Sequence, residues 1–106
     1  MEDRHAGKMQ RLVERVLNAP GELDPRTRRA ILEQRTEGVP PALLPYLDKV
    51  EHSAWTVTDE DIEALRQAGV SEDQIFEATV TAAVGAGLKR LRAGLAALGE
   101  RPPIGG

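Results

Sequence analysis

The residue types best suited to chemistry lie close together in one short segment, between Tyr46 and Trp55. Glu51 and His52 are adjacent there, and a histidine can act as a general acid or base when it is buried beside a carboxylate. Adjacent residues on a helix point about 100° apart, however, so these two do not form a pair by themselves. Two interpretations stay open: His52 and Glu51 are catalytic, or His52 lies at a surface or interface with Trp55 as a core anchor.

Cysteine chemistry is excluded, because the chain contains no cysteine. A disulfide framework, a thiol nucleophile and a cysteine-based metal site therefore cannot occur. The two histidines, His5 and His52, have no carboxylates at a spacing that would complete a metal-ligand set. We expect neither a metal site nor a cofactor.

The hydrophobic pattern predicts a single all-α domain of about five helices with a long C-terminal helix. A length of 106 residues fits one domain. Apolar residues recur at helical spacing in five stretches, which predict helices over residues 9–17, 25–38, 43–50, 59–68 and 72–98. We expect residues 55–57 to be extended, and residues 1–8 and 100–106 to be frayed tails.

Capping residues mark the beginnings of three of these helices. Asp24 is expected to cap the second helix, with Pro25 at its first position, where the missing N–H costs nothing. Thr58 is expected to cap the fourth helix. Ser71 opens the last helix, and Gln74 three residues later completes the pattern of a capping box.

The last predicted helix is longer than a domain of this size needs internally, about 40 Å at 1.5 Å per residue. Small residues make one segment of it thin, so that another backbone can approach closely. That backbone can belong to the same chain or to a neighbouring subunit. Because the helix is so long, we expect a subunit interface formed by Ala78, Ala82, Gly85 and Ala86.

The charge distribution argues against nucleic acid and membranes as partners. The net charge of −3 gives no general attraction to polyanions or anionic lipid. Residues 62–80 have the outline of a helix-turn-helix, but Glu72, Asp73 and Glu77 on the second helix would repel a phosphate backbone. The "VGAGLKR" segment lacks the preceding strand that a phosphate-binding loop requires.

The sequence also contains no apolar run of about 18 residues, which a membrane-spanning helix would need. Its first residues lack the apolar core of a signal peptide. We expect the protein to be cytoplasmic.

Four motifs in the second half of the chain carry a resemblance to a known family: "YLDKV", "VTDEDIEALRQAG", "SEDQIFEA" and the pair Arg90-Leu91. In these motifs, residues 42–91 resemble the C-terminal half of alkylhydroperoxidase D-like, carboxymuconolactone decarboxylase-like proteins. The resemblance covers about half the chain and implies an all-helical fold and homo-oligomeric assembly. Redox-active members use a Cys-x-x-Cys pair, which is absent here, so thiol peroxidase and disulfide reductase activities are excluded.

The resulting hypothesis is a non-redox member of this family that acts as a homo-oligomeric binding or accessory protein. Its partner would be a second copy of itself, and another protein is a further option. The decarboxylase branch of the family works without thiols or metal, which leaves an alternative. This is a cofactor-free acid–base enzyme, of decarboxylase or isomerase type, acting on a small carboxylate. The candidate catalytic residues are His52 and Glu51, and the candidate ligand-binding residues are Tyr46, Trp55 and Arg90.

Overall fold

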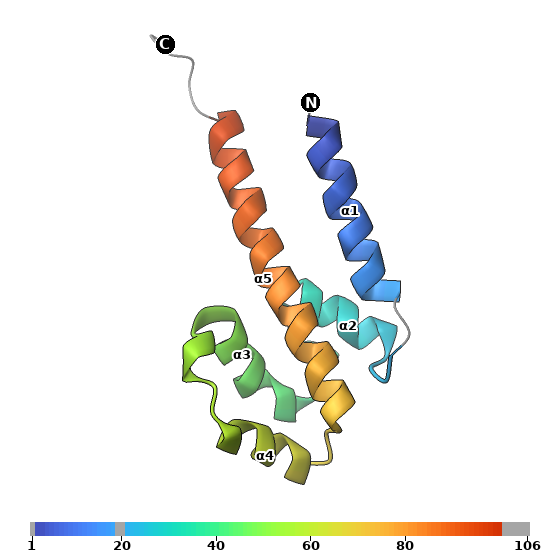
Figure 1. The fold of residues 1–106 in the computed structure, drawn as a ribbon, viewed down its shortest axis with the longest axis vertical. Helices are drawn as coiled ribbons and strands as arrows, with labels where there is room; N and C mark the ends of the chain where they lie inside the picture. Colours follow the sequence, from blue (N-terminus) through green and yellow to red (C-terminus); the bar gives the residue numbers. More distant parts are fainter. Residues whose placement is uncertain (1, 19–20, 101–106) are drawn as a thin grey trace.

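The computed structural model describes residues 2–18 and 21–100, and this part of the chain is all-helical. Its elements are α1 (Glu2–Asn18), α2 (Pro25–Leu32), the 3-10 turn η1 (Pro41–Leu43), α3 (Leu44–His52), the 3-10 turn η2 (Ala54–Thr56), α4 (Asp59–Gln67) and α5 (Glu72–Glu100) (Figure 1). The predicted fold class, all-α with five helices and a long C-terminal helix, is confirmed.

The two ends of the chain differ in part from the expectation of frayed tails. Helix α1 begins at Glu2, so it includes most of residues 1–8, and α5 continues to Glu100. Residues 1 and 101–106 lie outside the described part of the chain. The segment 55–57, expected to be extended, belongs mostly to the turn η2, and only Val57 has extended backbone angles.

Helix α2 begins where the sequence predicts but ends earlier. The side chain of Asp24 accepts a hydrogen bond from the backbone N–H of Arg26 at 2.9 Å, which caps the helix. The helix stops at Leu32 rather than near Gly38 because Gln34 takes a positive φ of 59°. The N–H of Arg35 then donates to the carbonyl of Ala30 at 2.8 Å, the terminating bond that glycine usually permits.

Helices α4 and α5 both begin with reciprocal side-chain caps. The N–H of Asp61 donates to the Thr58 hydroxyl at 3.2 Å, and the N–H of Thr58 donates to the Asp61 carboxylate at 2.9 Å. Ser71 and Gln74 make the equivalent pair of bonds at 3.1 and 3.0 Å. Lys49 of α3 donates to both oxygens of Asp61, which ties α4 to α3 and, with the Thr58 N–H, holds the pKa of Asp61 below its usual value.

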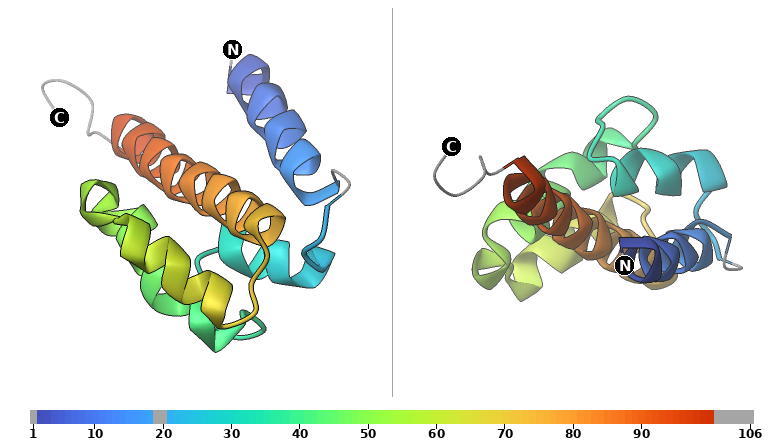
Figure 2. Two further views of the ribbon diagram at one scale, coloured as in Figure 1. Left: turned by 60° about the horizontal axis from the view of Figure 1, so that its bottom comes forward. Right: turned by 90° about the horizontal axis from the view of Figure 1, so that it is seen from above.

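The hydrophobic core lies where the first half of α5 crosses α2 and α3. Figures 1 and 2 show α3 and α4 on one side of α5 and α1 on the other. The buried core residues are Leu23, Ala30, Ile31, Val39, Leu43, Tyr46, Leu47, Leu65, Ile75, Ala78 and Ala82. The second half of α5 and the helix α1 extend past this core as two arms (Figure 1).

The arms give the molecule an elongated shape. Its radius of gyration is 16.3 Å and its principal extents are 59 × 28 × 22 Å. A compact domain of about 100 residues has a radius of gyration of about 13 Å. Much of α5 therefore lies outside the core that this chain builds by itself.

The small residues of α5 are buried within this chain, which corrects the expectation that they form a subunit interface. Ala78 and Ala82 have no exposed surface, and Ala86 is nearly as buried. Gly85 lies directly against the backbone of Leu32, the last residue of α2. The thin segment of α5 thus accommodates α2 of the same chain, which was the other of the two interpretations.

A substitution at Gly85 tests this backbone contact. A Cβ at this position would overlap the Leu32 carbonyl, and a backbone group cannot rotate away as a side chain can. Gly85→Ala is expected to lower the free energy of unfolding by about 1–3 kcal/mol, although alanine favours a helix. Urea unfolding followed by circular dichroism measures the change.

The matched control is Gly99→Ala in the same helix, where an added Cβ meets no atom within 4 Å. Its free energy of unfolding is expected to rise by up to about 1 kcal/mol, because alanine favours a helix and the added Cβ displaces nothing. Equal stability of the Gly85→Ala and Gly99→Ala variants would contradict the close contact between α2 and α5.

Candidate functional site

The structure brings three of the five predicted site residues around one cavity. Glu51 and His52 lie at the end of α3, and Arg90 lies on the facing side of α5. They line a cavity of about 230 Å³, together with Gln34 and Lys89. The Nη2 atom of Arg90 donates a hydrogen bond of 2.8 Å to the backbone carbonyl of Glu51, which joins the two helices at this point.

The fourth predicted residue, Tyr46, lies in the core rather than in this cavity. It is 7% exposed, and its hydroxyl lies 2.6 Å from the Oγ1 atom of Thr79. The Thr79 hydroxyl donates its own proton to the carbonyl of Ile75 at 2.6 Å, so Tyr46 must be the donor in the first bond. The hydroxyl of Tyr46 is thus occupied in a buried network between α3 and α5.

Trp55, the fifth residue, fits neither of its two predicted roles. It lies in the turn η2 and is 84% exposed, so it is not a core anchor, and it does not line the cavity at Glu51. Trp55 does not continue helix α3, because that helix ends at His52. The turn that contains Trp55 is held by a hydrogen bond from the Thr56 N–H to the carbonyl of Ser53.

The carboxylate partner of His52 is Asp48, not its neighbour Glu51. The Nδ1 atom of His52 lies 3.2 Å from an oxygen of Asp48, one helical turn earlier. The spacing of four residues along a helix signals this pair in the sequence. The His52 side chain is 64% exposed, so water competes for the interaction and the pair is a weak acid–base unit.

The protonation equilibrium of Glu51 is shifted by its position in the fold. Burial raises the pKa of its carboxyl, while the charges of His52 and Lys89 act in the opposite direction. A carboxyl that holds its proton at higher pH than usual can serve in acid–base chemistry. The cavity therefore combines a carboxyl of raised pKa with two cationic side chains, Lys89 and Arg90.

Gln34 is a cavity residue that the sequence does not point to. It lines the cavity at Glu51 and a neighbouring one of about 400 Å³ between α2 and α3. Gln34 has a positive φ of 59°, a left-handed conformation that glycine adopts more readily than any residue with a side chain. No sequence signal marks a glutamine in this conformation.

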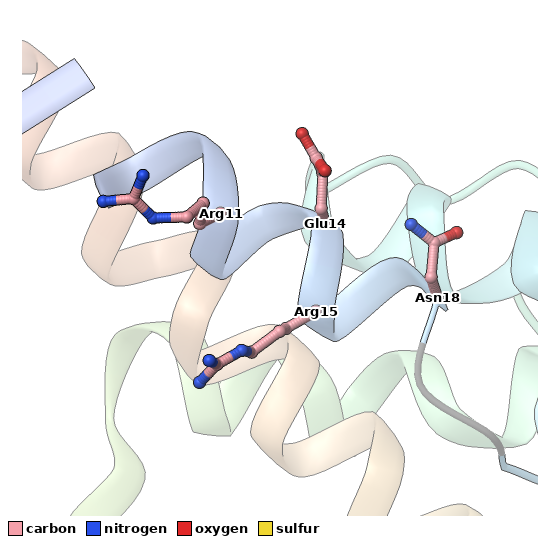
Figure 3. Close-up of a pocket in the computed structure, with 4 residues that line it drawn as sticks. All are labelled: Arg11, Glu14, Arg15 and Asn18. Atoms are coloured by element: carbon pink, nitrogen blue, oxygen red, sulfur yellow. The ribbon is translucent and has the colours of Figure 1, made fainter. Parts of the chain in front are cut away.

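A third cavity, of about 520 Å³, lies along α1 and is lined by Arg11, Glu14, Arg15 and Asn18. Figure 3 shows that these four side chains point in different directions and do not converge on a common point. Among the described residues, the lining of this cavity comes from one helix only. We assign it no function.

A second apolar face of α5 is the most extensive unpartnered feature of the described residues. Burial separates the apolar residues of α5 into two faces, one in the core and one exposed. Leu91 follows Ala82 by nine residues, which at about 100° per residue places it on the opposite side of the helix from the core. The large apolar side chains exposed on this face are Phe76, Val80, Leu91, Leu95 and Leu98.

This second face, which we define as residues 76–98 on the side away from Ala82, carries no charge along most of its length. From Val80 to Leu98 its other residues are Ala83, Val84, Gly87 and Gly94. Phe76 is 69% exposed at the end that borders α1, where it lines a cavity of about 290 Å³ with Val16, and Leu98 is 64% exposed at the other end. Continuous exposed apolar surface of this kind is unusual on a soluble monomer.

No family model, curated protein or solved structure matches the chain. Among the described residues, no three metal-ligating side chains gather into a group, and no helix is long and apolar enough to cross a membrane.

The raised pKa of Glu51 predicts a pH-dependent contribution to stability. A carboxyl whose pKa is higher in the folded state stabilises the fold while it is protonated, and this contribution is lost as the pH rises through the folded pKa. Glu51→Gln is therefore expected to be more stable than the unchanged chain at pH 7, with a smaller difference at pH 4. Urea unfolding at both pH values measures this.

Glu37→Gln provides the control, because Glu37 is exposed and its substitution removes the same formal charge. If both variants showed the same difference between pH 4 and pH 7, burial of Glu51 would not be the cause.

Proposed function

We propose that the protein is a homo-oligomeric, non-redox binding or accessory protein that acts through the second face of α5. The observation that carries this proposal is the charge-free, exposed apolar surface from Val80 to Leu98. Leu91, Leu95 and Leu98 are each about half exposed. Completing the burial of such a side chain contributes about 1 kcal/mol, so a partner on this face would gain stability from each one.

The geometry around the candidate catalytic residues supports a binding role over catalysis. His52 is mostly exposed and is paired with Asp48 rather than with Glu51. Tyr46 is occupied by its bond in the core, and Trp55 lies apart from the cavity. These placements leave the cavity at Glu51 without a buried, oriented acid–base pair.

The resemblance to alkylhydroperoxidase D-like, carboxymuconolactone decarboxylase-like proteins is part of this proposal. It implies homo-oligomeric assembly, which an exposed apolar face also favours. Location in the cytoplasm, without nucleic acid or membrane as a partner, completes the proposed role.

Sedimentation velocity over a wide range of concentration tests self-association. The sedimentation coefficient is expected to rise with concentration to that of a dimer or a larger assembly, because each added copy covers apolar surface. A coefficient that stays at the monomer value at every concentration would refute the homo-oligomeric role.

A second candidate function rests on the convergence of Glu51, His52 and Arg90 on one cavity. It is the acid–base enzyme acting on a small carboxylate, in which Arg90 and Lys89 would hold the substrate carboxylate and Glu51 would exchange the proton. The raised pKa of the Glu51 carboxyl supports this role.

Succinate serves as the probe for this second candidate. Addition of succinate is expected to shift the amide resonances of Arg90 and His52 saturably, and Arg90→Met is expected to abolish the shifts by removing the guanidinium. Arg92→Met, which removes an exposed cation two residues away that does not line this cavity, is the control and is expected to keep them. Equal shifts in both variants, or none in the unchanged chain, would argue against a carboxylate site.

A further inference from the structure

We propose that the cavity between α1, α2 and α5 binds a small monocarboxylate that carries an apolar ring or chain. Side chains from all three helices line this cavity. Its volume of about 290 Å³ is at the lower end of the range for small-molecule sites, so the ligand is small. The cavity is formed within one chain, so binding does not depend on the self-association proposed above.

The buried cation Arg28 of α2 supplies the polar end of the cavity. Arg28 is 6% exposed, and arginine is seldom buried so deeply. Its Nη1 atom donates a hydrogen bond of 3.2 Å to the carbonyl of Val16, in the last turn of α1. A guanidinium carries several N–H donors in a planar fork, so Arg28 can hold the end of α1 and also contact a carboxylate in the cavity.

A second guanidinium, that of Arg15 on α1, lines the same cavity. The acidic residue in the lining is Glu77, and its carboxylate is bonded to the connection between α1 and α2. It accepts hydrogen bonds from the backbone N–H of Glu22 at 2.6 Å and of Leu23 at 3.0 Å. These bonds stabilise the Glu77 charge where it is, so an anion in the cavity is attracted by two cations and opposed by one carboxylate that is already bonded.

Apolar side chains form the rest of the lining. They are Val16 of α1, and Phe76 and Val80 of α5. Phe76 is mostly exposed and Val80 is 40% exposed, so a ligand that covered them would remove apolar surface from water. The hydroxyl of Thr81 donates to the carbonyl of Glu77 at 2.7 Å, which leaves the arginines as the donors for an anion.

The two parts of the lining define the class of ligand. A carboxylate matches the planar fork of a guanidinium, and an aromatic ring packs well against a phenylalanine such as Phe76. An uncharged apolar ligand would remove water from Arg15 and Arg28 without replacing its hydrogen bonds, which is unfavourable. A dicarboxylate would place its second charge against Phe76 and Val80. A monocarboxylate with an apolar body avoids both costs.

Phenylacetate is the probe, because it joins one carboxylate to one aromatic ring. It is expected to shift the amide resonances of Arg28, Phe76 and Thr81 saturably, with a dissociation constant of about 1 mM or below. Phenylacetamide has the same shape without the charge, and acetate has the charge without the ring. Each is expected to bind at least about tenfold more weakly than phenylacetate. Equal binding of phenylacetate and phenylacetamide would overturn the role of the arginines.

Arg15→Met tests the cationic end with a variant that is expected to fold, because Arg15 is exposed. It is expected to raise the dissociation constant for phenylacetate about fivefold or more, since a charge-assisted hydrogen bond is lost. Arg11→Met is the matched control. It removes the same charge from an exposed position one turn earlier in α1 that does not line this cavity. At physiological salt it is expected to change the constant less than about twofold, because exposed charges outside the site are screened. Equal effects of the two substitutions would refute the site.

Phe76→Ser tests the apolar wall and is also expected to fold, because Phe76 is an exposed residue. It is expected to weaken phenylacetate binding about threefold or more, since less apolar surface is covered. Leu98→Ser is the control at the other end of the second face and is expected to leave the constant unchanged. Far-UV circular dichroism verifies the fold of each variant. Equal weakening by both would indicate binding to the second face in general and would overturn the assignment to this cavity.

The position of the shifts separates this site from the cavity at Glu51. Saturable shifts at Arg90 and His52 in place of Arg28 and Phe76 would refute the proposed site, and so would the absence of saturable shifts in the unchanged chain. Sedimentation velocity decides the homo-oligomeric function by itself. Either proposal can therefore fail while the other stands.

Discussion

The contact between Gly85 and the backbone of Leu32 is the constraint on which the rest of the structure depends. Only a residue without a side chain lets α2 end directly on α5, and this approach buries Ala78 and Ala82 on the same side of the helix. Once this side faces the core, the helical period leaves Leu91 on the outside. The core and the proposed interface are therefore two consequences of a single choice of which side of α5 faces inward.

The sequence predicts the helices of this fold well because their signals are local. The caps at Asp24, Thr58 and Ser71 each involve residues within three positions of one another. The rotation of α5 about its own axis does not follow from local signals. The helix has apolar residues on two sides, and the sequence does not show which side faces the core. The sequence predicts that α2 ends near Gly38, whereas the helix ends at Leu32. It ends early because Gln34 takes the left-handed conformation expected of glycine, which no local sequence signal indicates.

The candidate site shows the same limit. The convergence of Glu51 and Arg90 depends on how α3 packs on α5, across a separation of 39 residues, and no spacing rule covers it. The pairing of His52 with Asp48 is different, because its spacing of four residues is a helical signal that the sequence contains. Trp55 could not be placed from its type alone, since a large aromatic side chain is expected in the core and this one is not.

The second half of α5 raises a problem of stability that a single chain does not solve. It extends past the core, and Gly87, Gly94 and Gly99 all lower its intrinsic tendency to be helical. Helices in proteins gain most of their stability from packing an apolar face against something else. A partner on the second face would supply that packing, so binding and the order of this segment would be thermodynamically linked. Such a partner would account for the exposed leucines and for Gly87 and Gly94, which lie on the same face.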